Sequence, residues 1–329
     1  MPLRSTQTGA STCLRGRFLR KLHNRFHMPK FLDILQAYFR KTPNWGLATI
    51  AQRCAILFRL LFNHPVSSFK VFRALTGSDI VPLAIKDPII FLKFSFPIYA
   101  NGLSTADRAA AFAGHYEFLQ RCLNREFLEQ IIKAQATLWE AEMEGRNFGI
   151  YLGIAAPTYG EGELSLNFRS SATDLWILSF VIARTRPLGP DADLSIFVTR
   201  LQSKKDYPDL IKMATSSIGN VRPRLLLMAA LQGFALGLNI KHIFAVCAKE
   251  QVCSTSPPAP YFVSAYDEFW LSMNGKHLPS GWFYLSVPLP ETPLALIKQN
   301  HRPRVRTRRA FRYAISEAVR ERIENVRVV

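Results

Sequence analysis

Apolar residues recur at helical spacing in the first part of the chain. Phe58 and Phe62 lie on one face of the segment 46–62, which predicts an amphipathic helix. A similar pattern in FLDILQAYFRK predicts a shorter helix that Pro43 ends. The segment 69–97 is rich in Pro, Ile and Phe and indicates short strands and turns. The opening of the chain is therefore expected to be helical and then irregular.

Helix-start signals follow this segment. Ser104 and Asp107 form a capping box, in which both side chains satisfy free backbone N–H groups, and the helix they open is expected to end at Cys122. Asn124 can cap a second helix, which we expect to run to Glu144 before the glycine that follows it. The two segments together predict a helical hairpin.

The pattern changes to strands at Phe148. Four apolar or alternating runs follow one another with short connections, which predicts antiparallel strands: FGIYLGI, GELSLNFRS, DLWILSFVIA and DLSIFVTRLQ. Helix and strand signals then alternate, in the order helix 207–217, a helix from Pro223, strand KHIFAVCA, helix SAYDEFWLSMNG and strand GWFYLSVPL. This order predicts an α+β fold with a mixed, mostly antiparallel sheet and flanking helices.

Four regions result from this pattern. They are a basic N-terminal arm (1–43), a helical region (44–147), a mixed-sheet domain (148–297) and a basic C-terminal amphipathic helix (298–329). In the last region Phe311, Ile315, Val319 and Ile323 share one helical face.

The net charge of +18 is concentrated at the two ends of the chain. Residues 1–41 contribute +8 and residues 298–329 contribute +7. Two partners attract such segments, an anionic membrane surface and nucleic acid. We rank the membrane surface first, because no nucleic-acid-binding module is recognisable.

The cysteine content, the absence of recognisable targeting segments and the absence of cofactor motifs bear on the compartment and on cofactors. The five cysteines are odd in number and have no paired spacing, which favours a reducing compartment. No signal peptide or membrane span is predicted, so we expect a cytoplasmic protein, peripheral at the inner membrane. Cys247 and Cys253 have no zinc spacing, and no P-loop or full dinucleotide fingerprint occurs. Gly233 and Gly237 lie in a helical run, where we expect them to permit close packing.

Several patches resemble the VirK/YbjX family of bacterial proteins. They are IGNVRPRLLLMAALQGFALGLNIKHIFAVC and YDEFW, with IFVTRLQ, His115-Tyr116 and RTRRAFRY in matching order. The resemblance covers about 44–324 and implies a part in virulence, envelope remodelling and resistance to cationic antimicrobial peptides. It implies no particular reaction.

A weaker similarity is to the fold of the GCN5-related acetyltransferases. There a loop of backbone N–H groups before the central helix holds the pyrophosphate of acyl-coenzyme A. The matching residues here are Gly219, Asn220, Arg222 and Arg224, and a helix start with arginines is suited to anions. The loop departs from the family pattern, because it has one glycine, Pro223 removes a donor and an extra helix precedes it. The alternative is a turn with ordinary surface arginines.

Candidate catalytic residues follow from the same similarity. Tyr266 would protonate a leaving thiolate, and His115 could serve as a base, although both residue types more often pack in a core. Glu161, Glu163 and Asp174 could accept a proton, and their spacing selects none of them. Two functions stay open: an acyltransferase-like enzyme using acyl-coenzyme A or acyl carrier protein, and a regulatory adaptor that binds lipid or nucleic acid through its basic ends.

Overall fold

The computed structural model describes Gln36 and residues 47–77, 79–155, 160–184, 194–204, 206–254 and 257–328. The predicted basic arm and the helix predicted before Pro43 lie outside these residues, apart from Gln36. The helix predicted over 46–62 is present as α3 (Leu47–Asn63).

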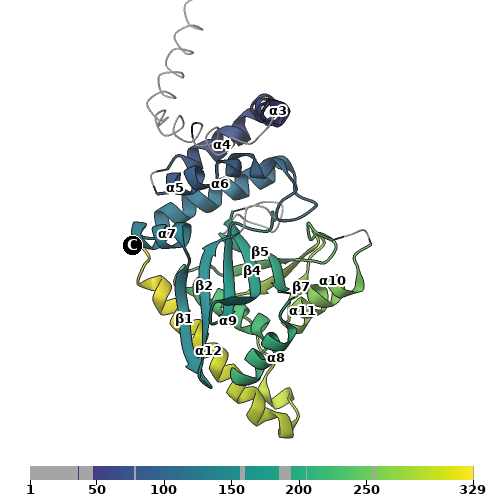
Figure 1. Ribbon diagram of the computed structural model, residues 1–329. Coiled ribbons are helices and arrows are strands. Elements are labelled where there is room, and N and C mark those ends of the chain that lie inside the picture. The colour runs from purple at the N-terminus through teal and green to yellow at the C-terminus, as the bar shows by residue number, and fades with distance from the viewer. Residues whose placement is uncertain are drawn as a thin grey trace, which may run out of the picture.

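One sheet of eight strands organises the described chain, in the spatial order β1-β2-β3-β4-β5-β6-β8-β7 (Figure 1). Its strands are β1 (Ala136–Met143), β2 (Arg146–Ile154), β3 (Leu164–Ser170), β4 (Thr173–Ala183), β5 (Ser195–Ser203), β6 (His242–Val246), β7 (Lys276–His277) and β8 (Trp282–Ser286). β2 to β5 are the four predicted strands, and they pair antiparallel as expected. β5 and β6 are parallel, so the sheet is mixed and the predicted α+β class is confirmed.

The predicted helix from Asn124 to Glu144 is wrong in its second half. Asn124 does cap a helix, α7 (Arg125–Lys133), by accepting a hydrogen bond from the Phe127 N–H at 2.9 Å. The chain then enters β1, whose burial alternates along the strand, and turns at Glu144 and Gly145. Both turn residues have positive φ, which is the geometry of a tight β-hairpin. The sheet thus begins inside the region that we expected to be helical.

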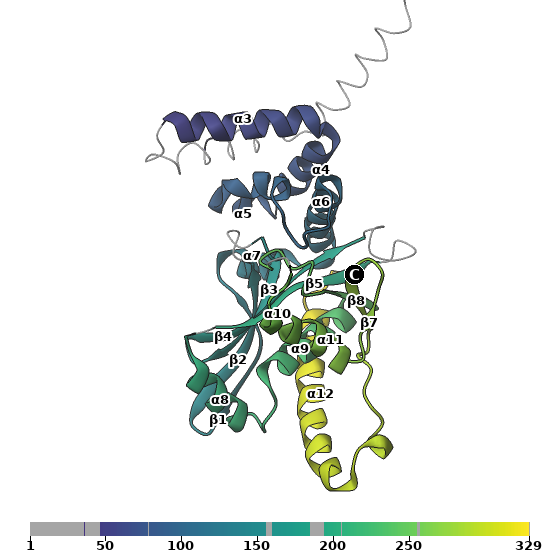
Figure 2. The same cartoon turned by 90° about the vertical axis from the view of Figure 1, so that its right-hand side faces the viewer.

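The segment 69–97 is helical, so the expected strands and turns there are wrong. It contains most of α4 (Pro65–Leu75), together with α5 (Val81–Lys86) and the 3-10 helix η1 (Pro88–Ser95). Each of these helices has a proline in its first turn, where the missing N–H is not needed. The prolines therefore begin helices here. With α3 and α6 (Thr105–Cys122), these helices form a cap over one end of the sheet (Figures 1 and 2).

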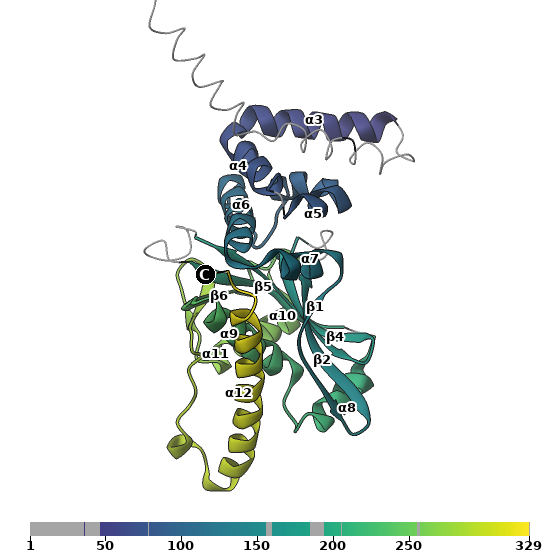
Figure 3. The ribbon, with the colours of Figure 1, turned by 90° about the vertical axis from the view of Figure 1, so that its left-hand side faces the viewer.

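Two long helices cover one face of the sheet. They are α9 (Pro223–Gly237), preceded by α8 (Pro208–Ser217), and α12 (Arg302–Glu324), and they run side by side in the same direction (Figure 3). A Cβ on Gly233 would lie 2.1 Å from the Ser316 carbonyl oxygen, and one on Gly237 would lie 2.9 Å from Ile323 Cβ. The predicted close packing at these glycines is confirmed. It brings the first turns of both helices together.

A single hydrophobic core joins the cap, the sheet and α12. The predicted apolar face of the C-terminal helix is present, because Ile315, Val319 and Ile323 are buried in this core. The end of the chain returns to the cap, where the Asn124 N–H donates to the Val326 carbonyl at 2.8 Å. No helix among the described residues is long and apolar enough to cross a membrane.

Candidate functional site

Six arginines line one pocket of about 550 Å³ at the start of α9. Arg222 and Arg224 come from the beginning of α9, and the other four come from the first three turns of α12: Arg304, Arg308, Arg309 and Arg312. The last four recur at spacings of about one helical turn, so they share a face. We call this group the arginine pocket.

The charge of the arginine pocket is only partly neutralised. Glu291 bridges Arg309 (Nε–Oε2, 2.7 Å) and Arg312 (Nη2–Oε1, 2.5 Å). Within the described residues, no carboxylate forms an ion pair with Arg222, Arg224, Arg304 or Arg308. Four guanidinium groups without a counter-charge favour the binding of an anion.

Mutual repulsion and burial act on these guanidinium groups. Burial, and next the Arg222 charge, lowers the pKa of Arg224, whose guanidinium lies 4.4 Å from the centre of the Phe269 ring. Burial, followed by the charges of Arg304 and Arg222, also lowers the pKa of Arg308. The Arg308 Nε is buried without a hydrogen-bond partner in the described part of the protein. A bound phosphate would relieve both the repulsion and the missing hydrogen bond.

The predicted anion loop contributes to this pocket in part. Asn220, Arg222 and Arg224 line it, whereas Gly219 does not. Gly219 and Asn220 have φ values of 69° and 56° and form the turn that leads from α8 to α9. The Leu225 N–H donates to the Arg222 carbonyl at 2.8 Å, so this backbone donor is not free for a ligand. The first turn of α9 therefore favours an anion more through the helix dipole than through unpaired N–H groups. Side chains therefore carry most of the recognition.

A second polar group lies where the cap meets the sheet, centred on Glu163. Its carboxylate, 1% exposed, forms an ion pair with Lys93 (2.7 Å) and accepts hydrogen bonds from the Tyr99 and Tyr116 hydroxyls (2.7 Å each). Lys93 also donates to the Gly162 carbonyl at 2.7 Å. Every oxygen of this buried carboxylate thus has a partner, as a buried charge requires.

Glu161 lies two residues earlier and faces a different set of partners. Its Oε2 is 2.9 Å from Arg200 Nη1, and it also accepts hydrogen bonds from Gln251 and the Cys253 thiol. Burial raises the pKa of Glu161, and the Arg200 charge opposes that rise. A carboxylate with a raised pKa is suited to accept a proton. By contrast, the third candidate acid, Asp174 on β4, accepts a hydrogen bond at 2.5 Å from the Nε of Arg169, its pairing partner on β3.

Tyr266 lies at the start of α11 (Asp267–Ser272) and bonds to β5 next to Arg200, the partner of Glu161. β5 and β6 pair over four residues, up to Val198, and the buried Tyr266 hydroxyl accepts hydrogen bonds from the Leu201 N–H (3.4 Å) and the Gln202 amide (3.1 Å) farther along β5. Burial, and then the Glu161 charge, raises the pKa of Tyr266, so the hydroxyl keeps its proton. Tyr266 lies between the short helices α10 (Pro260–Ala265) and α11, where the sequence indicated one helix.

His115 contacts a different strand from Tyr266. It is fully buried on α6, and its Nδ1 accepts a hydrogen bond from the Ile182 N–H of β4 at 3.0 Å. Burial lowers the pKa of His115 to about 3, with the Lys93 charge acting in the same direction. The ring is therefore neutral, and its proton lies on Nε2, which has no partner among the described residues.

This environment predicts a pH-dependent stability. Below about pH 6.5 the unfolded chain protonates His115 and the folded chain does not, so stability falls as the pH falls, by about 1.4 kcal/mol per unit. Between about pH 6.5 and about pH 5 the loss is about 2 kcal/mol. Urea unfolding should show a shallower pH profile for His115→Asn than for wild type. The exposed His277→Asn is the control, and parallel profiles for all three proteins would contradict the account.

Four residues of this second group are not among the candidates that the sequence predicts: Lys93, Tyr99, Arg200 and Gln251. One signal was available for Lys93, a single charge inside the apolar run IIFLKFSF. Among the described residues, no three His, Cys, Asp or Glu side chains are grouped as metal ligands would be.

Comparison with known proteins gives one match. A family model described as "Protein of unknown function (DUF535)" matches residues 48–325. No curated protein and no solved structure matches the chain. Since the matched residues cover most of the sequence, the chain belongs to the DUF535 family, which is the VirK/YbjX family that its sequence resembles.

Proposed function

We propose that this protein is an acyltransferase-like enzyme whose donor is a phosphate-bearing acyl thioester, acyl-coenzyme A or acyl carrier protein. The observation that carries the proposal is the arginine pocket. Its four arginines that have no carboxylate partner among the described residues suit the phosphates of such a donor better than a neutral ligand.

We place the reaction centre at Tyr266 and Glu161, on the side of the pocket that α11 lines. Phe269, Ser272 and Met273 line the pocket, and Tyr266 precedes Phe269 by one helical turn. Tyr266 reaches β5 beside Arg200, which holds Glu161. A donor with its phosphates in the pocket would extend its thioester along α11 toward Tyr266.

The proposed reaction uses Glu161 and Tyr266 in opposite roles. The Glu161 carboxylate takes the proton of an acceptor hydroxyl or amine, which attacks the thioester carbonyl. The C–S bond then breaks, and the leaving thiolate takes the proton of Tyr266. Because the Tyr266 oxygen already accepts two hydrogen bonds, its own proton is free to donate. The proton that Glu161 has taken then passes to the Tyr266 oxygen, which resets both groups, so that the net transfer is from the acceptor to the leaving thiol. The resemblance to VirK/YbjX proteins makes a lipid or envelope precursor the acceptor class that we propose.

A thermal-shift scan tests the binding step. Acetyl-coenzyme A, long-chain acyl-coenzyme A and coenzyme A at about a hundred times the dissociation constant should each add about 2.7 kcal/mol of apparent stability. Glu161→Gln should bind these ligands as wild type does and lose acyl transfer. Absence of any shift would reject the donor and favour the adaptor role, in which the basic surfaces alone bind a partner.

A further inference from the structure

We propose that α3 and the start of α4 form a membrane-docking face that lies on an anionic lipid bilayer. This proposal stands independently of the acyl transfer proposed above. Phe58 is 69% exposed and Phe62 is 77% exposed, and their rings stack 5.9 Å apart. Leu61, the neighbour of Phe62 on α3, and Val66, at the start of α4, are also exposed. We call these four residues the apolar crest.

The crest exposes large side chains next to one another. Single exposed apolar residues are ordinary on a protein surface, whereas a contiguous group marks an interaction site. Phe58, Leu61 and Phe62 recur at three- and four-residue spacing on α3, so they project from one side of the helix. An exposed pair of stacked aromatic rings has no role in the core of the protein.

The charge around the crest identifies the partner as anionic. The segment from Leu47 to Leu75 contains four basic residues and no acidic residue, and one of the four, Arg73, is paired with Glu117 of α6. Among them, Arg59 and Lys70 are exposed. Residues 1–41, which precede α3 in the chain, carry a further +8. Apolar side chains combined with basic ones and without acids are typical of helices that lie in the headgroup region of anionic membranes.

The position of α3 in the fold is compatible with docking on a flat surface. α3 lies at one end of the described structure, and the start of α12 lies at the opposite end (Figures 1 and 2). No described helix can span a bilayer, so binding would be interfacial. A protein docked through α3 would hold the arginine pocket away from the membrane. The pocket would then meet a soluble donor, while the cap and the Glu161 region would lie nearer the lipid.

Co-sedimentation of the full chain with vesicles tests this face. Wild-type protein should pellet with phosphatidylglycerol–phosphatidylcholine vesicles, more weakly at high salt, and much less with phosphatidylcholine alone. The double variant Phe58→Asn/Phe62→Asn should bind at least about tenfold more weakly, because its apolar insertion is lost.

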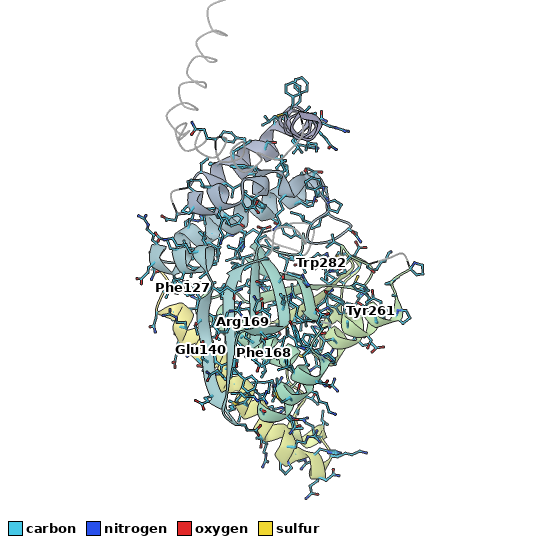
Figure 4. The ribbon with its side chains drawn as sticks, viewed as in Figure 1. Phe127, Glu140, Phe168, Arg169, Tyr261 and Trp282 are labelled. Atoms are coloured by element: carbon cyan, nitrogen blue, oxygen red, sulfur yellow. The ribbon has the colours of Figure 1, made fainter. Side chains whose placement is uncertain are left out.

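A control variant replaces two exposed apolar side chains elsewhere with asparagine. Tyr261 and Leu296 are 64% and 76% exposed and lie outside the cap, Tyr261 on the α10 side of the molecule (Figure 4). Tyr261→Asn/Leu296→Asn should bind vesicles as wild type does. Circular dichroism melts should show that both variants fold.

Three results would overturn the proposal. They are no binding of wild-type protein to anionic vesicles, equal binding by the two double variants, and a wild-type dimer by light scattering that Phe58→Asn/Phe62→Asn converts to a monomer. The last result would make the crest a surface for a second copy of the chain. Since none of these measurements involves an acyl donor, failure here leaves the proposed acyl transfer untouched.

Discussion

Replacing Lys93 with methionine is expected to lower the free energy of unfolding by about 3–5 kcal/mol. Lys93 is 6% exposed and is the cation that balances the buried Glu163. Without it, a carboxylate that has left water keeps only the hydroxyls of Tyr99 and Tyr116. Two neutral hydrogen bonds do not compensate for the desolvation of a full charge. Urea unfolding monitored by circular dichroism measures the loss.

Two further variants separate charge from packing at this position. Lys93→Met/Glu163→Gln removes both charges and should recover at least about 1 kcal/mol relative to Lys93→Met. Lys298→Met makes the same change on an exposed lysine and should alter stability by less than about 0.5 kcal/mol. If the double variant is no more stable than Lys93→Met, lost packing rather than an unbalanced charge explains the effect.

Gly233→Ala is the second large expected effect, a loss of about 3 kcal/mol in the free energy of unfolding. The added methyl would lie 2.1 Å from the Ser316 carbonyl oxygen, a backbone atom that only a shift of α12 can move. A thermal melt measures the loss. Because the shift would separate the first turns of α9 and α12, the variant should also bind coenzyme A more weakly.

Gly114→Ala is the matched control for this substitution. Gly114 also lies within a helix, α6, but nothing lies within 4 Å of a Cβ placed there. Alanine is the better helix former by up to about 1 kcal/mol, so Gly114→Ala should be neutral or stabilising. A similar loss for both variants would mean that helix contact at Gly233 is not the cause.

Much of the fold could be predicted because local patterns agreed with tertiary structure. The four alternating runs from Phe148 became β2 to β5, and the caps at Ser104 and Asn124 start α6 and α7. The failure at 134–144 has a physical cause. Ala, Glu, Leu and Met favour a helix in isolation, but pairing with β2 and burial of alternate residues outweigh that preference.

Only those residues of the candidate site that lie close together in sequence, at the start of α9, could be predicted. Arg222 and Arg224 stood out because they flank a helix start, and both line the pocket. From the sequence alone, the arginines of α12 predict only a basic tail that binds a membrane or nucleic acid. Their meeting with α9 depends on the parallel packing at Gly233 and Gly237, which joins residues more than 80 positions apart. Lys93 and Glu163 likewise meet only through the contact between the cap and the sheet.

The most direct test of the arginine pocket is calorimetric titration of coenzyme A into wild-type protein and three single variants. Arg222→Ala and Arg308→Ala each remove one guanidinium from the pocket and should weaken binding at least about tenfold, as expected for an arginine–phosphate contact. Arg306→Ala removes the same charge from an exposed position of α12 outside the pocket and should bind within about twofold of wild type. Equal weakening by all three variants, or no binding by wild-type protein, would contradict a phosphate-bearing donor in this pocket.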